Sequence, residues 1–101
     1  MKINIPTEEQ KMQLAKMLHL ALLEIRSVAS EGNAELAEDI ADVFHNLPKI
    51  LLGCGVWDLE DFRNNLEYYE QKYDYKSNEI FTCHIAEFDS ICPDINKSVN
   101  R

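Results

Sequence analysis

The stretch that decides the fold of this chain is Ala34–Pro48, which reads AELAEDIADVFHNLP. Its apolar residues recur at spacings of three and four, as in an amphipathic helix; they are Leu36, Ala37, Ile40, Ala41, Val43, Phe44 and Leu47. The opposite face carries four carboxylates that we expect to be exposed: Glu35, Glu38, Asp39 and Asp42. Pro48 ends the helix, because the residue before a proline is disfavoured in the helical conformation. The pattern predicts a helix from about Ala34 to Asn46.

A longer amphipathic helix is predicted before this stretch, from Thr7 to Ser30. Thr7 and Gln10 form the pattern of a capping box at its start. Its apolar stripe consists of Leu14, Met17, Leu18, Ala21, Leu22, Ile25, Val28 and Ala29. Gly32 suits the left-handed position after a helix, and Asn33 can cap the next one. We therefore expect a short turn between these two helices.

Two further helices are predicted after a short turn at Lys49–Leu52 and a loop at residues 53–55. Asp58 is a good N-cap for the third helix, whose inward residues are Leu59, Phe62, Leu66, Tyr69 and Tyr73. Ser77 can cap the last helix and Pro93 ends it; its inward residues are Ile80, Phe81, Ile85 (or His84) and Phe88. Among the other aromatic residues, Trp57 is expected in the core, whereas Tyr68 and Tyr75 are expected at the surface.

These patterns predict an all-α fold, a single-domain bundle of about four to five helices over residues 1–101. A chain of 101 residues is large enough for one hydrophobic core and too small for two. Residues 94–101 are expected to be a frayed tail. Glu79–Ile85 is the only segment with any strand character, and we expect it to be helical.

Charge restricts the class of partner. The formal net charge is −8, and eleven carboxylates between Glu31 and Asp74 are offset only by Lys49, Arg63 and Lys72. A polyanion is repelled by nucleic acid and by anionic membrane surfaces, so we expect neither as a partner. A basic protein is the complementary partner, although solubility alone also explains an acidic surface. The polar N-terminus, the lack of long apolar runs and the three widely spaced cysteines favour a cytoplasmic protein with reduced thiols.

Residues of reactive types do not form a recognisable catalytic or metal-binding pattern. Cys54 between two glycines, with His45 nearby, and the pair Cys83–His84 are the candidates for a thiol enzyme or a metal site. Asp42 and His45 are a weak echo of a carboxylate–histidine metal motif. His45 before a helix end is more typical of structural capping. We therefore expect no enzyme activity, no cofactor and no metal, and a protein that functions by binding.

The chain resembles a family of small bacterial α-helical proteins. The similar segments are Ala34–Pro48, Leu22–Arg26 before it, and Trp57–Arg63 and Tyr69–Tyr73 after it. The family shares an A-D-x-F-H-N-L-P core and a W-x-x-x-x-F-R segment, and some members are immunity proteins of contact-dependent growth inhibition and related polymorphic toxin systems. The resemblance implies stoichiometric inhibition of a cognate toxin C-terminal domain by binding.

The partner-binding residues that this reading favours lie on the second and third helices. They are Glu35, Glu38, Asp39, Asp42, Glu60, Asp61, Glu67 and Tyr68. Such toxins are often nucleases, whose basic clefts an acidic helical face would complement. The alternative is an acidic adaptor or regulatory protein with a different cellular partner, which exposed apolar area would favour. The oligomeric state, the identity of the toxin and the site of inhibition stay open at this point.

Overall fold

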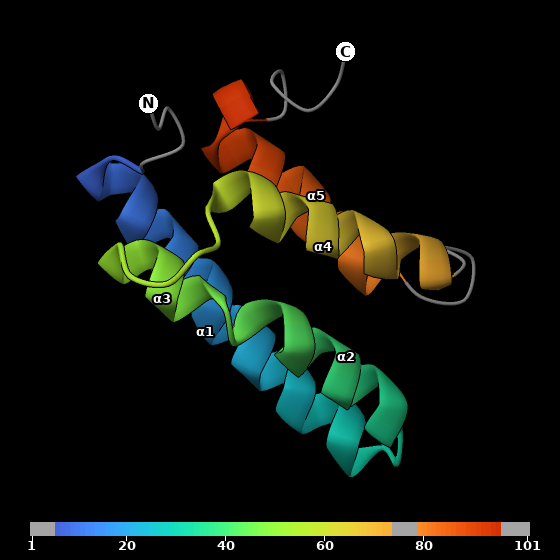
Figure 1. The fold of residues 1–101 in the computed structure, drawn as a ribbon. Helices are drawn as coiled ribbons and strands as arrows, with labels where there is room; N and C mark the ends of the chain where they lie inside the picture. The colour runs from blue at the N-terminus through green and yellow to red at the C-terminus, as the bar shows by residue number, and fades with distance from the viewer. Residues whose placement is uncertain (1–5, 74–78, 96–101) are drawn as a thin grey trace.

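The computed structural model describes residues 6–73 and 79–95, which form five α-helices and no strand (Figure 1). The helices are α1 (Glu8–Ser30), α2 (Ala34–Phe44), α3 (Leu47–Leu52), α4 (Leu59–Lys72) and α5 (Ile80–Ile91). The predicted all-α bundle of four to five helices is confirmed. The segment Glu79–Ile85 contributes to α5 and has no strand character.

Local capping chemistry begins three of these helices where the sequence indicates. Thr7 and Gln10 form a reciprocal capping box at α1, with side-chain to backbone distances of 3.1 and 2.9 Å. Asn33 caps α2 by accepting a hydrogen bond from the amide of Leu36 at 3.2 Å. Asp58 and Asp61 form a second capping box at α4. These contacts satisfy backbone donors that have no partner within the helix, so they fix the start of each helix.

Two helix ends differ from the prediction. The second helix ends at Phe44, and a new helix, α3, begins at Leu47 with Pro48 inside its first turn. A proline is tolerated there because the first-turn amide has no partner within the helix. At α5 the N-cap is Glu79, and the predicted cap Ser77 lies outside the described residues, as does Tyr75.

The C-terminal segment is more ordered than we expected. Pro93 does follow the end of α5, but residues 93–95 form a further helical turn. Ile95 is only 5% exposed and belongs to the core. The prediction of a frayed tail from Asp94 is therefore wrong for Ile95, because its apolar side chain is buried in the core. Residues 96–101 of that predicted tail lie outside the described part of the chain.

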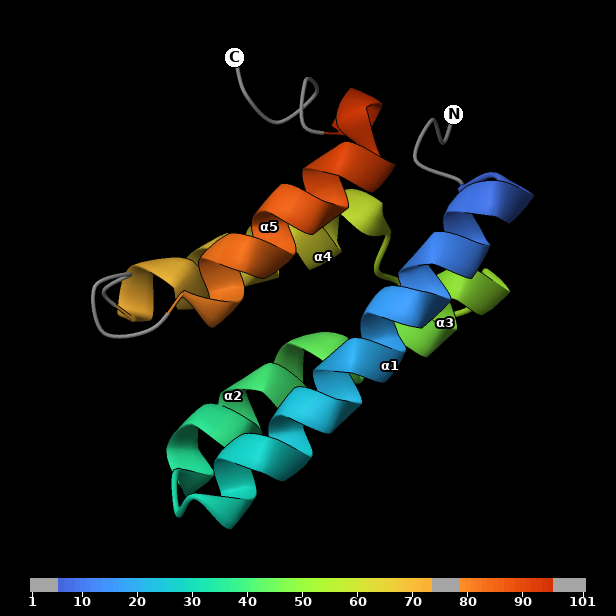
Figure 2. The same ribbon diagram turned by 180° about the vertical axis from the view of Figure 1, so that it is seen from behind.

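The helices form two packed units. Helices α2 and α3 lie along α1, and the antiparallel pair α4–α5 crosses this layer (Figures 1 and 2). Phe44 of α2, Phe62 of α4 and Phe88 of α5 meet in the core, with ring centroids 5.4 Å apart for Phe44–Phe62 and 5.6 Å apart for Phe62–Phe88. Aromatic side chains from three helices thus join the two units through tilted and edge-to-face contacts.

Ion pairs and hydrogen bonds also connect the helices inside the bundle. Arg63 of α4 is only 5% exposed and donates to both carboxylate oxygens of Asp89 on α5, at 2.7 and 2.9 Å, and to Glu67 at 2.8 Å. These hydrogen bonds, that to Asp89 above all, raise the pKa of Arg63. His84 of α5 contacts Glu24 of α1 at 2.6 Å. Some of the charged side chains therefore hold helices together rather than face solvent.

The predicted apolar faces are only partly buried. In α1, Leu14, Met17 and Ala21 are in the core, whereas Leu22 is 54% exposed, against the prediction. Ala29 is also exposed. The reason is that neighbouring helices cover one side of this long helix, and its outer side has no neighbour among the described residues (Figure 2).

Candidate partner-binding surface

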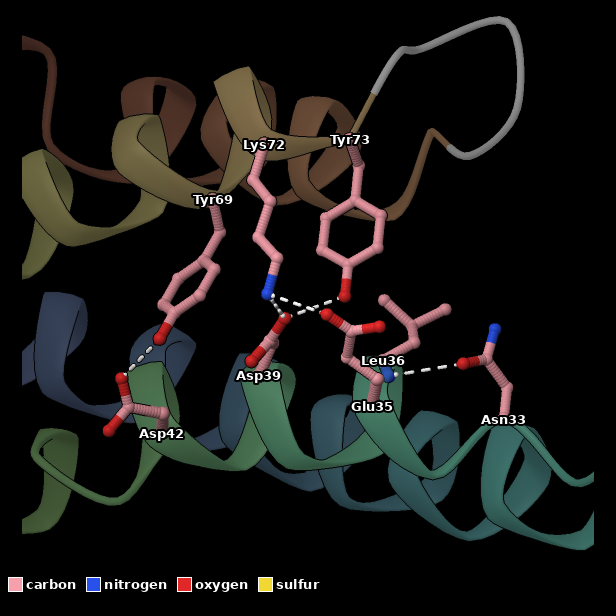
Figure 3. A network of polar contacts seen from close by, with 8 residues as sticks. All are labelled: Asn33, Glu35, Leu36, Asp39, Asp42, Tyr69, Lys72 and Tyr73. Atoms are coloured by element: carbon pink, nitrogen blue, oxygen red, sulfur yellow. Dashed lines mark hydrogen bonds and ion pairs between the residues drawn. The ribbon is translucent and has the colours of Figure 1, made fainter.

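The acidic face of α2 points towards α4 (Figure 3). Asp39 is 8% exposed, so the prediction that it lies at the surface is wrong. Its Oδ2 atom accepts hydrogen bonds from Lys72 Nζ at 2.7 Å and Tyr73 Oη at 2.6 Å. The burial of this carboxylate is compensated by a cation and a hydroxyl, as buried charges require.

Two other carboxylates of α2 complete this arrangement. Asp42 Oδ2 accepts from Tyr69 Oη at 2.6 Å, and Glu35 Oε2 lies 3.0 Å from Lys72 Nζ. We call the six residues the α2–α4 clamp: Glu35, Asp39, Asp42, Tyr69, Lys72 and Tyr73. Within it, the hydrogen bond to Asp42 raises the pKa of Tyr69, and the hydrogen bonds to Asp39 and Glu35 raise that of Lys72. Burial and the Asp39 hydrogen bond raise the pKa of Tyr73 to about 12.

The rings of the clamp also pack on the core. Tyr69 and Tyr73 stack on Phe81 of α5, with ring centroids 5.4 and 5.6 Å apart. Both tyrosines are half-buried, in keeping with their predicted inward direction. The clamp therefore joins the two packed units of the bundle through apolar as well as polar contacts.

Of the eight predicted binding residues, four are paired with side chains inside the bundle and four have no ion pair to a described residue. Glu35, Asp39 and Asp42 belong to the clamp, and Glu67 pairs with the buried Arg63. Glu38 is exposed on α2, outside the clamp. The other three, Glu60, Asp61 and Tyr68, lie on α4 and leave carboxylate or ring surface accessible. Of the predicted residues, the structure brings Asp61 and Tyr68 together in one hollow, whereas Glu67 is paired with Arg63 and Glu38 lies on another helix.

The outer side of α4 carries a shallow hollow that contains two of these residues. Trp57, Asp61, Asn64, Asn65 and Tyr68 line it, and its volume is about 360 Å³. Apart from Trp57, which precedes the N-cap, these residues recur at helical spacings of three and four, so they form one stripe of the helix surface. Tyr68 is 63% exposed, as predicted, and Trp57 is 39% exposed. We call this hollow the outer groove.

The prediction for Trp57 is also wrong. This residue was expected in the core, but it lies between the chain turn at residues 53–56 and the first residue of the α4 stripe. Helical spacing gave no signal for this position, because Trp57 precedes the extended N-cap Asp58 and lies outside the repeat of α4. An exposed tryptophan beside an exposed tyrosine is typical of protein-binding hot spots.

A second hollow, lined by more aliphatic residues, adjoins the outer groove. It lies between α3 and the start of α4, has a volume of about 280 Å³ and shares Trp57 with the outer groove. Leu52 and Val56 line it and are 79% and 90% exposed. Gly53, which ends α3 at a φ of 74°, lets the chain turn here. The two hollows meet at Trp57, and Lys11 of α1, which pairs with Glu8 at 3.2 Å, is among the residues that line the second one.

Among the candidates for chemistry, His45 has a structural contact, and the described residues show no catalytic pairing for the exposed thiols. His45 contacts the carbonyl oxygen of Asp42 at 2.6 Å through Nδ1, which is the capping role predicted for it. Burial raises the pKa of the Cys92 thiol to about 11, which disfavours the reactive thiolate. Cys54 and Cys83 are exposed, and no hydrogen bond to a histidine is found for either in the described residues. Within the same residues, no group of three or more His, Cys, Asp or Glu is placed to hold a metal ion.

Comparisons with known proteins give no further guide to function. No model of a protein family matches the chain, and no curated protein or solved structure shows significant similarity to it. Among the described helices, none is both long enough and apolar enough to cross a membrane. The surface of the bundle is therefore the best indication of what the protein does.

Proposed function

We propose that this protein is a cytoplasmic immunity protein that binds a basic bacterial toxin domain and inhibits it stoichiometrically. The observation that carries the proposal is the outer groove, where two exposed aromatic side chains flank Asp61 and no cation is among the lining residues. The resemblance of Ala34–Pro48 and Trp57–Arg63 to immunity proteins supplies the class of partner. A function in binding needs no catalytic group, and none of the exposed thiols is paired with a base in the described residues.

Electrostatics supports a basic partner. Carboxylates without an ion pair to any described residue are spread over the surface; they include Glu31, Glu38, Glu60 and Glu70. Lys72 and Arg63, the cations nearest to the outer groove in sequence, are held by carboxylates of the bundle. The outer side of α4 is therefore negative, which speeds association with a basic surface and selects against acidic ones.

The shape of the surface supports inhibition by occlusion. Tyr68 and Trp57 offer large, rigid contact areas, and Leu52 and Val56 extend the apolar part beyond them. Interfaces obtain most of their binding energy from a few such anchors, while the surrounding polar residues exclude water. A nuclease cleft, which is basic because it holds phosphates, would meet both the charge and the aromatic anchors of this surface.

A growth-rescue assay tests the proposal. The chain would be co-expressed with the C-terminal domain of the protein encoded immediately upstream of it in its source genome. We expect rescue from toxicity and a 1:1 complex on purification. The substitutions Tyr68→Ala and Glu60→Lys should weaken both results, whereas Glu31→Lys, which makes the same charge change at the α1–α2 turn, should not. A toxic domain that is neither rescued nor bound would contradict the proposal.

An adaptor function is the second candidate, and one observation favours it. Leu20, Leu22 and Leu23 are 54%, 54% and 44% exposed on α1, away from the outer groove. Exposed apolar side chains gathered on one helix are typical of protein-binding sites. For an adaptor that binds through α1, Leu20→Ser with Leu23→Ser should abolish capture of its partner. The substitution Tyr68→Ala should then have no effect, which is the opposite of the result expected for the outer groove.

A further inference from the structure

The outer groove has the chemistry of a receptor for one cationic side chain. Its lining combines two aromatic rings, from Trp57 and Tyr68, with a carboxylate, from Asp61, and two side-chain amides, from Asn64 and Asn65. Aromatic faces attract cations, a carboxylate pairs with them, and amide oxygens accept their remaining N–H groups. No residue that lines the groove supplies a positive charge. We propose that the groove receives an arginine side chain of the partner, with its guanidinium paired to Asp61 and stacked on Trp57.

Asp61 has a carboxylate oxygen to spare for this contact. Its Oδ2 atom accepts the backbone amide of Asp58 at 3.0 Å as part of the capping box. Its Oδ1 atom has no hydrogen-bond partner among the described residues, and the side chain is half-buried. The capping bond fixes the orientation of the carboxylate, so pairing with a guanidinium would cost little side-chain entropy.

The groove stays negative because of the α2–α4 clamp. Lys72 stands one helical turn beyond Tyr68, close enough for its long side chain to neutralise this side of α4. Its ammonium is drawn instead to Asp39 at 2.7 Å and Glu35 at 3.0 Å. At the other end, the start of α4 carries about half a positive charge from the helix dipole. Asp58, Glu60 and Asp61 in and before the first turn exceed that charge.

Arginine fits this lining better than lysine does. Its guanidinium is planar, stacks on aromatic faces and is weakly hydrated, whereas the ammonium of lysine is compact and strongly hydrated. The fork of N–H donors can contact Asp61 and an amide oxygen of Asn64 or Asn65 at the same time. Phosphates and other anions would find no cation among the residues that line the groove and would be repelled by Asp61, so a nucleic acid does not fit the groove.

Trp57 provides a direct readout, because it is the only tryptophan of the chain. Its indole N–H signal and its fluorescence would be followed during titration with N-acetyl-arginine methylamide. The lysine analogue and the citrulline analogue, a neutral molecule of nearly the same shape as arginine, are the controls. We expect a saturable shift with arginine, weak on the millimolar scale, a smaller one with lysine and none with citrulline. An equal response to arginine and citrulline, or no saturable response to arginine, would overturn the proposal.

Substitutions then place the cation. Asp61→Asn keeps an oxygen for the capping bond and removes only the charge, so it should weaken arginine binding about tenfold. Glu31→Gln removes one charge at the α1–α2 turn and should leave binding unchanged. If both variants weaken binding equally, the effect is one of net charge and the proposed site is wrong.

This inference rests on the proposed function only for the role of the groove in the complex, and the two can fail separately. Rescue by the protein without any arginine response would leave the immunity function standing and remove the arginine site. An arginine response without rescue or complex formation would leave the arginine site standing and remove the immunity function. In the complex, Asp61→Asn should weaken binding of the toxin domain as well, which connects the two experiments.

Discussion

On α2, Asp39 is 8% exposed and accepts hydrogen bonds from Lys72 and Tyr73, whereas on α4, Asp61 lines the outer groove together with the exposed residues Trp57 and Tyr68. The same residue type thus has a structural role in one helix and is open to a partner in the other. What differs is the neighbour. The clamp carboxylates face a helix surface that offers an ammonium and two hydroxyls, whereas no cation is among the described residues that line the outer groove.

The comparison shows that an acidic helix is not by itself a docking surface. A carboxylate that already accepts two short hydrogen bonds gains little from a partner's cation, since the internal donors would have to be given up. A carboxylate at a groove without cations keeps its full field and draws a basic partner towards it. The following substitutions test this distinction, beginning with the largest expected effect.

The largest effect should come from removing the cation of an inward ion pair. Arg63→Met leaves Asp89 without its bidentate partner inside the bundle, and we expect a loss of about 3 kcal/mol in the free energy of unfolding. Urea unfolding followed by circular dichroism would measure it. In the Arg63→Met background, Asp89→Leu should recover part of the loss, because an apolar pair replaces an unpaired charge. A loss no larger than that of a surface substitution would show that the Arg63 network is not structural.

A smaller loss is expected when the clamp is opened. Asp39→Ala leaves Tyr73 and Lys72 without their shared acceptor, and we expect the free energy of unfolding to fall by about 2 kcal/mol. A double-mutant cycle with Tyr73→Phe isolates the hydroxyl contact and should give a coupling of about 1 kcal/mol. The response of the indole signal to the arginine analogue should weaken only modestly, since Asp39 does not line the outer groove and Glu35 still holds Lys72. Additive effects in the cycle would contradict the clamp.

The clamp should also weaken at alkaline pH. Its environment raises the pKa of Tyr73 to about 12, above the value of about 10 for a free tyrosine. The stability that this raised pKa contributes is therefore complete below pH about 10. It is lost as the pH rises towards 12, because Tyr73 loses its proton at a lower pH in the unfolded chain than in the folded chain. Urea midpoints measured across this window should fall less steeply for Tyr73→Phe than for the unchanged chain. Parallel slopes would show that folding does not perturb Tyr73.

Much of the fold was predictable because its signals are local. The capping residues Thr7 and Asp58, the turn at Gly32 and the spacing of apolar residues act within one or two helical turns. Short-range hydrogen bonds and backbone preferences determine these features, so they can be read without knowing what packs where. The same local signals indicated the all-α bundle.

The roles of the carboxylates were not predictable in this way. Asp39 lies at the boundary of the α2 stripe, next to Ile40, and its burial depends on Lys72 and Tyr73, which are more than thirty residues away in sequence. The exposure of Trp57 likewise depends on the path of the chain between α3 and α4. Long-range packing decides such positions, and a pattern within a single helix cannot contain it. Of the predicted binding residues, Glu60, Asp61 and Tyr68 share the outer side of α4, whereas Glu38 lies apart.

The smallest effect on stability should come from the outer carboxylates of α4. They should differ most from the clamp carboxylates, because they affect association with the partner rather than folding. Glu60→Gln removes a charge in the first turn of α4 that has no ion pair to a described residue, so we expect the free energy of unfolding to change by less than about 0.5 kcal/mol. Association with the basic toxin domain should slow several-fold at low salt, and the difference should shrink at high salt, where exposed charges are screened. Asp39→Ala should show the opposite combination, a larger loss of stability with a smaller change in the association rate, because Glu35 still holds Lys72. Stopped-flow mixing at two salt concentrations, beside urea unfolding of both variants, measures all four quantities. If Glu60→Gln associates as fast as the unchanged chain at low salt, the acidic side of α4 does not steer the partner, and the exposed leucines of α1 become the better candidate surface.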